Sequence, residues 1–302
     1  MNKTVLLGLN AFPPGSIPSS LTTTINGNAA QTPVDTLEVS LTRLCHHMFL
    51  DTRGQLPPRP NPFFSFYKGF VTSGLPLEFV EGGLGSHKEA RIAESMTVGK
   101  AFCRWFLDTH FGIKHFAHME HVIGQTAPSL YGRVRVLRVA KGDTPDYLCS
   151  DGVHNPSLAE AKGRQQGSIS FTNADFASWR QQVRRVEVVD ELGNTISVKA
   201  NIVATRFRIE TEGSRIQSKL FAEDPETEGT RDLDKEVFLK ALRASRSTTD
   251  SLLGDTSTTE SRSDDTAPLE APESLPYSIS ILRNGSLLTP ASFMELETVD
   301  EF

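Results

Sequence analysis

The chain has 302 residues and a formal net charge of -6, and 38% of its residues are hydrophobic. This length allows a sizeable core in one or two domains, whereas the hydrophobic share is below average for a globular protein and indicates that part of the chain lies outside that core. No apolar run approaches the length of about 18 residues that a membrane span needs. The three cysteines have no CxxC spacing. The sequence therefore predicts a cytoplasmic protein without a membrane span, a disulfide framework or a zinc site.

The charge is distributed unevenly along the chain. Residues 221–302 contain 18 Asp and Glu against 7 Lys and Arg, a balance of -11, so the total of -6 leaves +5 for residues 1–220. The acidic total therefore does not exclude a nucleic-acid partner for the first part of the chain.

The N-terminal 85 residues predict a helical and irregular region. Residues 1–34 show no sustained hydrophobic period, whereas Asp35 followed by Glu38 is typical of a helix N-terminus and predicts a helix to about Leu50. Residues 54–85 combine prolines with a cluster of aromatic residues. These aromatic side chains either form a surface that stacks on bases or binds a partner, or they pack a loop onto the core.

The clearest helix pattern runs from Ser86 to about Asp108. Ser86 has the features of an N-cap with Glu89 three residues later, and apolar residues then recur at helical spacing. Glu94 lies near the middle of this helix beside small side chains.

Two strands are expected next, over residues 115–123 and 131–140. In the second, Arg133 and Arg135 alternate with valines, which predicts a half-buried strand with a basic outer face. This basic face either follows a phosphate backbone or is the soluble edge of a sheet.

The most informative stretch is residues 144–164. Pro145 and Asp146 precede a short apolar run, a turn follows, and a second strand contains Glu160 and Lys162. In a strand, side chains two apart share a face, so Glu160 and Lys162 project to the same side. If the two strands pair as a hairpin, Asp146 comes close to Glu160.

Two carboxylates and an ammonium group at one point suggest a particular chemistry. Paired carboxylates bind Mg²⁺ or Mn²⁺, which prefer oxygen ligands. Such an ion lowers the pKa of a bound water and neutralises charge on a phosphate, and a lysine nearby orients the water or stabilises the developing negative charge. This combination is suited to hydrolysis of a phosphodiester bond.

These residues resemble the PD-(D/E)xK nuclease superfamily. Pro145-Asp146 is similar to its PD element, and Glu160-Ala161-Lys162 is similar to its (D/E)xK element. The resemblance implies a restriction-endonuclease-like α/β core over residues 86–210, in which helices flank a mixed central sheet. It also implies that Asp146, Glu160 and the Ala161 carbonyl hold Mg²⁺ or Mn²⁺, that Lys162 activates water, and that a helical glutamate faces the metal. Glu94 is the candidate for that glutamate, with Glu89 as the alternative.

The remaining elements complete the expected order of the core. A helix capped by Thr172 or Asn173 is expected to about residue 186, and a strand over residues 197–209. Related nucleases often place a glutamine on this helix, which makes Gln181 and Gln182 weak candidates. From residue 211 to residue 302 the composition predicts an acidic, partly disordered region with one helix over about 232–246 and a hairpin over 276–288.

The function that the resemblance implies is metal-dependent hydrolysis of DNA, with a bacterial defence or mobile-element system as the suggested setting. The alternative is a catalytically silent nuclease-like domain that binds nucleic acid or a partner protein. The sequence is compatible with a partner protein or a homo-oligomer, and a membrane partner is not expected. It contains no helix-turn-helix or zinc-finger pattern that would recognise a DNA sequence.

Overall fold

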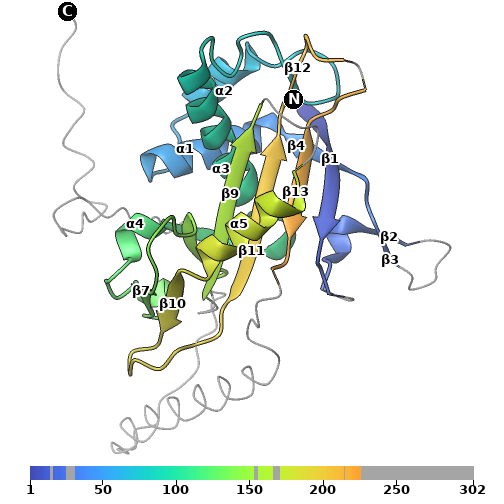
Figure 1. Ribbon diagram of the computed structural model, residues 1–302. Helices are drawn as coiled ribbons and strands as arrows, with labels where there is room; N and C mark the ends of the chain where they lie inside the picture. The colour runs from blue at the N-terminus through green and yellow to red at the C-terminus, as the bar shows by residue number, and fades with distance from the viewer. Residues whose placement is uncertain (14–15, 25–30, 153–155, 166–170, 214, 226–302) are drawn as a thin grey trace, which may run out of the picture.

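A seven-stranded mixed sheet forms the centre of the molecule (Figure 1). The computed structural model describes residues 1–13, 16–24, 31–152, 156–165, 171–213 and 215–225. The strands lie in the order β4-β1-β13-β11-β9-β8-β6. Their bounds are β1 (Asn2–Asn10), β4 (Thr36–Ser40), β6 (His115–His118), β8 (Tyr147–Ser150), β9 (Pro156–Arg164), β11 (Lys199–Arg206) and β13 (Lys219–Glu223).

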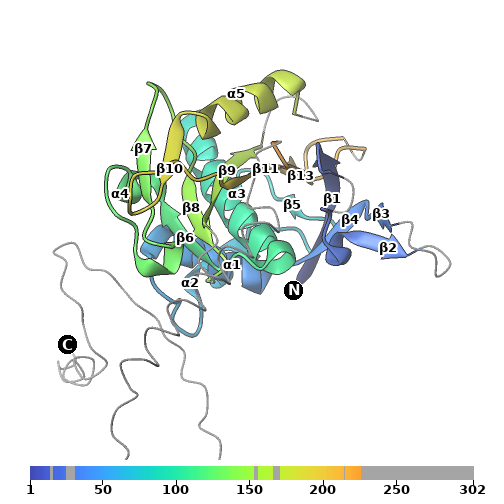
Figure 2. The ribbon, with the colours of Figure 1, turned by 90° about the horizontal axis from the view of Figure 1, so that it is seen from below.

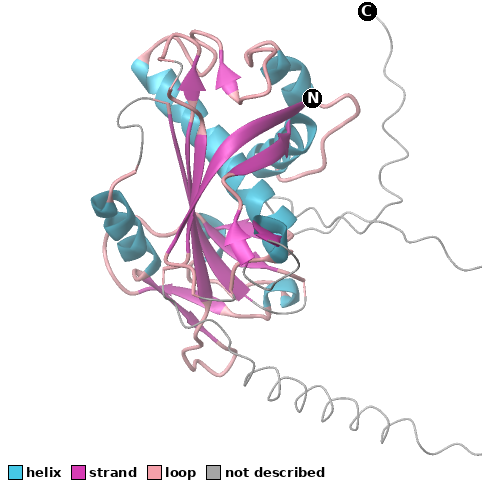
Figure 3. Ribbon diagram, turned by 90° about the vertical axis from the view of Figure 1, so that its right-hand side faces the viewer, coloured by secondary structure: helices cyan, strands magenta, loops and turns pink. Residues whose placement is uncertain are grey.

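The sheet mixes parallel and antiparallel neighbours, and its strands twist relative to one another (Figure 3). The pairs β1–β13 and β9–β11 are parallel, and the other four neighbouring pairs are antiparallel. The shorter strands form three two-stranded ribbons. These ribbons are β7 (Arg135–Arg138) with β10 (Val186–Val189), β5 (Glu78–Phe79) with β12 (Arg208–Ile209), and β2 (Thr22–Thr24) with β3 (Gln31–Pro33).

Helices cover both faces of the sheet, with α3 and α5 on opposite sides (Figure 2). The described helices are α1 (Leu41–Arg53), α2 (Pro62–Lys68), α3 (Lys88–Phe111), α4 (Met119–Val122) and α5 (Asn173–Val183), with 3₁₀ turns at Ser19–Leu21 and Ser129–Tyr131. None of these helices combines the length and hydrophobicity needed to cross a membrane.

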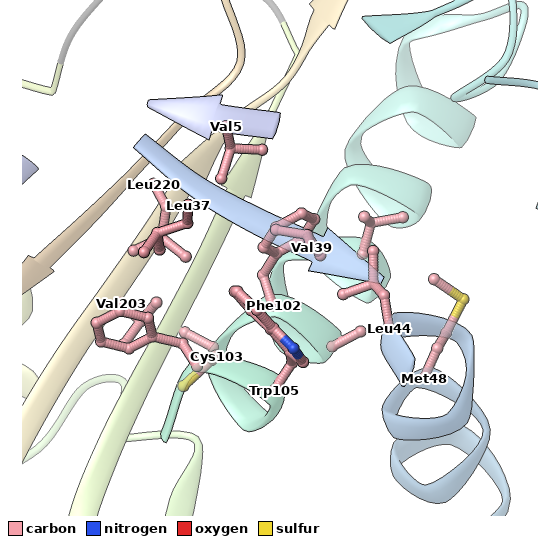
Figure 4. Close-up of a cluster of buried hydrophobic side chains, with 14 of the residues drawn as sticks. Val5, Leu37, Val39, Leu44, Met48, Phe102, Cys103, Trp105, Val203 and Leu220 are labelled. Carbon is pink, nitrogen blue, oxygen red and sulfur yellow. The ribbon is translucent and has the colours of Figure 1, made fainter. Parts of the chain in front are cut away.

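The largest core lies between the sheet and the α1–α3 pair (Figure 4). Phe102 and Trp105 of α3 are buried there against Leu44 of α1 and Val203 of β11. On the opposite face, Trp179 and other aromatic side chains of a smaller cluster cover β11. A mixed α+β fold is therefore present, as the sequence predicts.

The predicted α3 and α5 helices are both present, with small differences in their bounds. The N-cap of α3 is His87 rather than Ser86, and its ring accepts a hydrogen bond from the Ala90 N–H. Thr172 caps α5 in a reciprocal capping box with Asp175.

Three element predictions are wrong in extent or type. Residues 36–40 form strand β4 instead of the start of a helix, because Leu37 and Val39 alternate into the core and the segment pairs with β1. The predicted strand over 115–123 ends at His118, where a turn of helix begins. Of the strand predicted over 131–140, only β7 forms, and it pairs with β10 outside the central sheet.

The central sheet crosses both boundaries that the sequence suggested. Strands β1 and β4 come from the expected N-terminal region of residues 1–85, and β13 comes from the expected C-terminal region of residues 211–302. These strands pair with each other and, through β13, with β11. The predicted helix near residues 232–246 and the predicted hairpin over 276–288 lie outside the described residues.

Candidate active site

The β8–β9 hairpin brings Asp146 and Glu160 together, as the sequence predicts. Tyr147 pairs with Ala159 at the end of the ladder, so Asp146 and Glu160 occupy the next opposed positions. The Ala161 N–H donates a hydrogen bond of 2.9 Å to Asp146 Oδ2. Because the N–H and the C=O of one strand residue point to the same edge, the Ala161 carbonyl is also directed towards Asp146.

Glu160 and Lys162 lie on the face of β9 that α5 covers. Lys162 forms an ion pair with Glu160, and Gln182 of α5 lies beside both side chains. The NH₂ group of Gln182, when turned towards the carboxylate, donates a hydrogen bond to each oxygen of Glu160. The bond to Oε2 has a length of 3.0 Å. Ala159 and Ala161 face the opposite core, so the predicted alternation of side chains along β9 is confirmed.

Burial controls the electrostatics of Glu160. The side chain is completely buried, and this burial raises its pKa to about 8. The neighbouring Asp146 carboxylate also raises the pKa, whereas the ion pair with Lys162 lowers it. A buried carboxylate beside a second carboxylate is an environment that an additional cation would stabilise.

The donor set is compatible with a hard divalent cation. Asp146, Glu160 and the Ala161 carbonyl offer oxygen atoms, which are the ligands that Mg²⁺ and Mn²⁺ prefer, and Mg²⁺ usually retains several waters. Within the described ranges, no group of three or more His, Cys, Asp or Glu side chains is arranged to hold a metal ion. The fit therefore rests on two carboxylates and one carbonyl.

A second lysine, Lys100 of α3, contacts the site. Its Nζ lies 3.2 Å from Asp146 Oδ1, and its side chain is 27% exposed. Burial lowers the pKa of Lys100, but the carboxylates of Asp146, Asp51 and Glu160 together outweigh this effect and the net shift is upward. Each carboxylate of the site is thus paired with a lysine. The sequence pattern does not predict Lys100 as a site residue, because its position depends on where α3 crosses β9.

Glycines determine that crossing. A Cβ atom at Gly163 would lie 1.8 Å from the Ser95 carbonyl oxygen, and one at Gly99 would lie 2.7 Å from the Gly163 Cα. No side chain fits between the two backbones at this point, so α3 and β9 approach each other directly. This close approach places Lys100 over the strand that carries Glu160.

The structure does not bring Glu94 together with the other predicted site residues. Glu94 accepts a hydrogen bond from the Tyr67 hydroxyl of α2. It precedes Lys100 by six residues, which corresponds to about 9 Å along the helix axis. The alternative, Glu89, is 80% exposed and lies next to His87. The helix therefore presents a lysine to the two carboxylates.

A buried polar network supports β8 next to the site. Asp51 of α1 is 5% exposed and accepts a hydrogen bond of 2.6 Å from the Tyr147 hydroxyl. Arg104 Nη1 lies 3.4 Å from the same oxygen, and His118 Nε2 lies 3.1 Å from the Asp51 carbonyl. Because Tyr147 follows Asp146 directly, this network fixes the start of β8 and the position of Asp146.

The site opens into a hollow of about 360 Å³. Asp146, Glu160, Lys162 and Gln182 line one side of it, and residues of the segment that leads from β7 to β8 line the other side. Glu94 is not among the lining residues. A substrate in this hollow would lie against Asp146 and Lys162, with the buried Glu160 carboxylate directly behind them.

Comparisons with protein-family models, curated proteins and solved structures gave no match to this chain. The function is therefore argued from the geometry and chemistry of the site.

Proposed function

We propose that the protein is a metal-dependent nuclease that hydrolyses phosphodiester bonds of DNA. The observation that supports this most is the convergence of Asp146, Glu160 and Lys162 in one hollow at the end of the β8–β9 hairpin. This set is the one that the PD-(D/E)xK resemblance requires. A restriction-endonuclease-like arrangement of the core belongs to the same proposal.

Asp146, Glu160 and the Ala161 carbonyl would hold Mg²⁺ or Mn²⁺. When bound, such an ion supplies a water of lowered pKa and neutralises charge on the phosphate. The Ala161 N–H keeps one Asp146 oxygen in place, and Gln182 does the same for Glu160. The carboxylates are therefore oriented before a substrate arrives, which reduces the cost of organising the site.

Lys162 supplies a positive charge inside the hollow. Its side chain is 22% exposed and lies against the buried Glu160. In this position it can orient a water or stabilise negative charge that develops on the phosphate. The effect of such a charge is larger in a site that is partly shielded from water.

One observation favours the alternative of a catalytically silent nuclease-like domain. Both carboxylates are already paired with lysines, Asp146 with Lys100 and Glu160 with Lys162. The helix also presents Lys100 where the resemblance leads one to expect a glutamate. In this alternative the same hollow binds nucleic acid or a partner protein without cutting it.

Cleavage assays separate these two functions. Supercoiled plasmid and linear DNA are incubated with Mg²⁺ or Mn²⁺ and with the wild type, Glu160→Gln or Lys162→Met. Glu120→Gln is a matched control, because the Glu120 side chain is 78% exposed on α4. We expect metal-dependent cutting by the wild type and the control, and loss of cutting in both site variants. A wild type that binds DNA and never cuts it would instead identify the silent domain.

A further inference from the structure

A second hollow continues the site along the segment that follows β7. Residues 138–142 line this hollow of about 500 Å³. Arg138 and Gly142 also line the hollow that contains Asp146 and Glu160, so the two hollows adjoin. The segment 138–143, which we call the flanking turn, therefore borders both hollows.

Two arginines hold the flanking turn in place. Arg138 Nη1 donates a hydrogen bond of 3.1 Å to the Gly142 carbonyl, and Arg185 Nη1 donates one of 2.9 Å to the Asp143 carbonyl. The Val139 N–H also donates to the Arg185 carbonyl at 2.9 Å. A turn that is fixed by three such bonds presents its side chains in a defined arrangement.

Gly142 explains how closely Arg185 approaches the turn. The φ angle of Gly142 is +112°, and a Cβ atom there would lie 2.7 Å from the Arg185 Cζ. The backbone conformation favours glycine, and a side chain here would displace the Arg185 guanidinium group. Each guanidinium group has five N–H donors, so these hydrogen bonds of Arg138 and Arg185 occupy a minority of them.

The charge of the flanking turn suits a polyanion. Arg138 and Lys141 are exposed, Arg185 is half-buried behind them, and Asp143 is the acidic residue of the turn. The guanidinium fork matches the geometry of phosphate oxygens, and a lysine acts as a point charge for the same groups. A nucleic-acid strand whose phosphodiester lies in the hollow of Asp146 and Glu160 would pass Arg138, which lines both hollows.

We propose that the flanking turn binds the phosphodiester backbone of a nucleic-acid strand beside the bond at the carboxylates, with Arg138 and Lys141 contacting phosphates. The part that concerns the bond to be cut rests on the proposed function, whereas the binding of the backbone does not. Because the contacts are made to phosphates, they position the strand without reading its sequence.

Salt-dependent binding tests this proposal. A fluorescently labelled duplex of mixed sequence, and one of its strands alone, are titrated with the full chain in a metal chelator so that nothing is cut. The variants are Arg138→Ala and Lys141→Ala. Arg43→Ala is the matched control, because Arg43 is 56% exposed on α1, carries the same charge and lines neither hollow. Lys141 is exposed, so its substitution is expected to leave the fold intact.

Each flanking-turn variant should weaken binding of the labelled nucleic acid. The slope of log K against log salt should become shallower by about 0.9 for each lost phosphate contact on a duplex, or by about 0.7 on a single strand. The control should keep the slope of the wild type. Comparison of the two probes shows whether the flanking turn contacts the duplex, the single strand or both, because only a contacted probe changes its slope in the variants.

Two results would overturn the proposal: a wild type without salt-dependent binding, or flanking-turn variants with the same slope as the control. Its failure can be told apart from failure of the proposed function. If the wild type cuts DNA and the variants bind normally, the flanking turn is not the contact although the protein is a nuclease. If the variants bind more weakly and the wild type never cuts, the flanking turn binds nucleic acid in a protein that is not a nuclease.

Discussion

Gly99 allows a quantitative test of the α3–β9 crossing. In an ordinary helix interior, replacing glycine with alanine stabilises the helix by about 1 kcal/mol. Here a Cβ atom would lie 2.7 Å from the Gly163 Cα and N and 2.8 Å from the Lys162 carbonyl carbon, all of them backbone atoms. Overpacking of this kind costs about 1–3 kcal/mol. Because backbone atoms cannot move to another rotamer as side chains can, we expect the upper end of this range, about 3 kcal/mol, from which the helix gain of about 1 kcal/mol is subtracted. Gly99→Ala should therefore destabilise the protein by about 2 kcal/mol.

Urea unfolding followed by circular dichroism measures this difference. Gly213→Ala is the matched control, because a Cβ atom at Gly213 meets nothing within 4 Å and should change the free energy of unfolding little. Gly99→Ala should also reduce any cleavage activity at a temperature where it is fully folded, since the added Cβ presses on the backbone of Lys162 and Gly163 and displaces the strand that carries Glu160 and Lys162. An unchanged or increased free energy of unfolding for Gly99→Ala would refute the close crossing.

Four further outcomes follow from the structure. Asp51→Ala should destabilise the protein by about 3–5 kcal/mol in thermal or urea unfolding, because it leaves Arg104 buried without its partner. Thr172→Ala should cost about 1 kcal/mol in the same assay, because it removes the capping box of α5. A chain that ends at residue 210 should fail to fold by circular dichroism, because it lacks β13, which joins β1 to β11. Burial lowers the pKa of His110 from 6.5 to about 4, so the unfolded chain binds the proton first as the pH falls. Stability should therefore decrease from about pH 6.5 towards about pH 4, and His110→Gln should flatten that decrease.

Local patterns predicted the parts of the site that are close in sequence. Asp146, Glu160 and Lys162 lie on one hairpin, so alternation and turn residues are sufficient to place them together. The α3 and α5 helices were predicted for the same reason, since caps and apolar spacing are local properties.

Features that depend on distant pairing were not predicted. The segment after Asp35 satisfies a helix cap pattern, but its pairing with β1 makes it a strand. Lys100 reaches Asp146 only because Gly99 and Gly163 let α3 lie directly on β9. The spacing of residues within one segment cannot predict a contact between distant segments such as Lys100 and Asp146. The same holds for Asp51 of α1, which accepts a hydrogen bond from Tyr147.

The position of β13 has a consequence for how the chain folds as it is made. Strand β1 is synthesised before the other strands of the sheet, yet its two partners in the sheet are β4 and β13, and β13 begins only at Lys219. The hairpin with Asp146 and Glu160 can pair as soon as residue 164 is available, whereas β1 and β4 cannot join the sheet until residues 219–223 have been added. Closing so long a loop is slow compared with local pairing. The β8–β9 hairpin is therefore expected to form early, and the joining of the N-terminal strands to be the late step that completes the sheet.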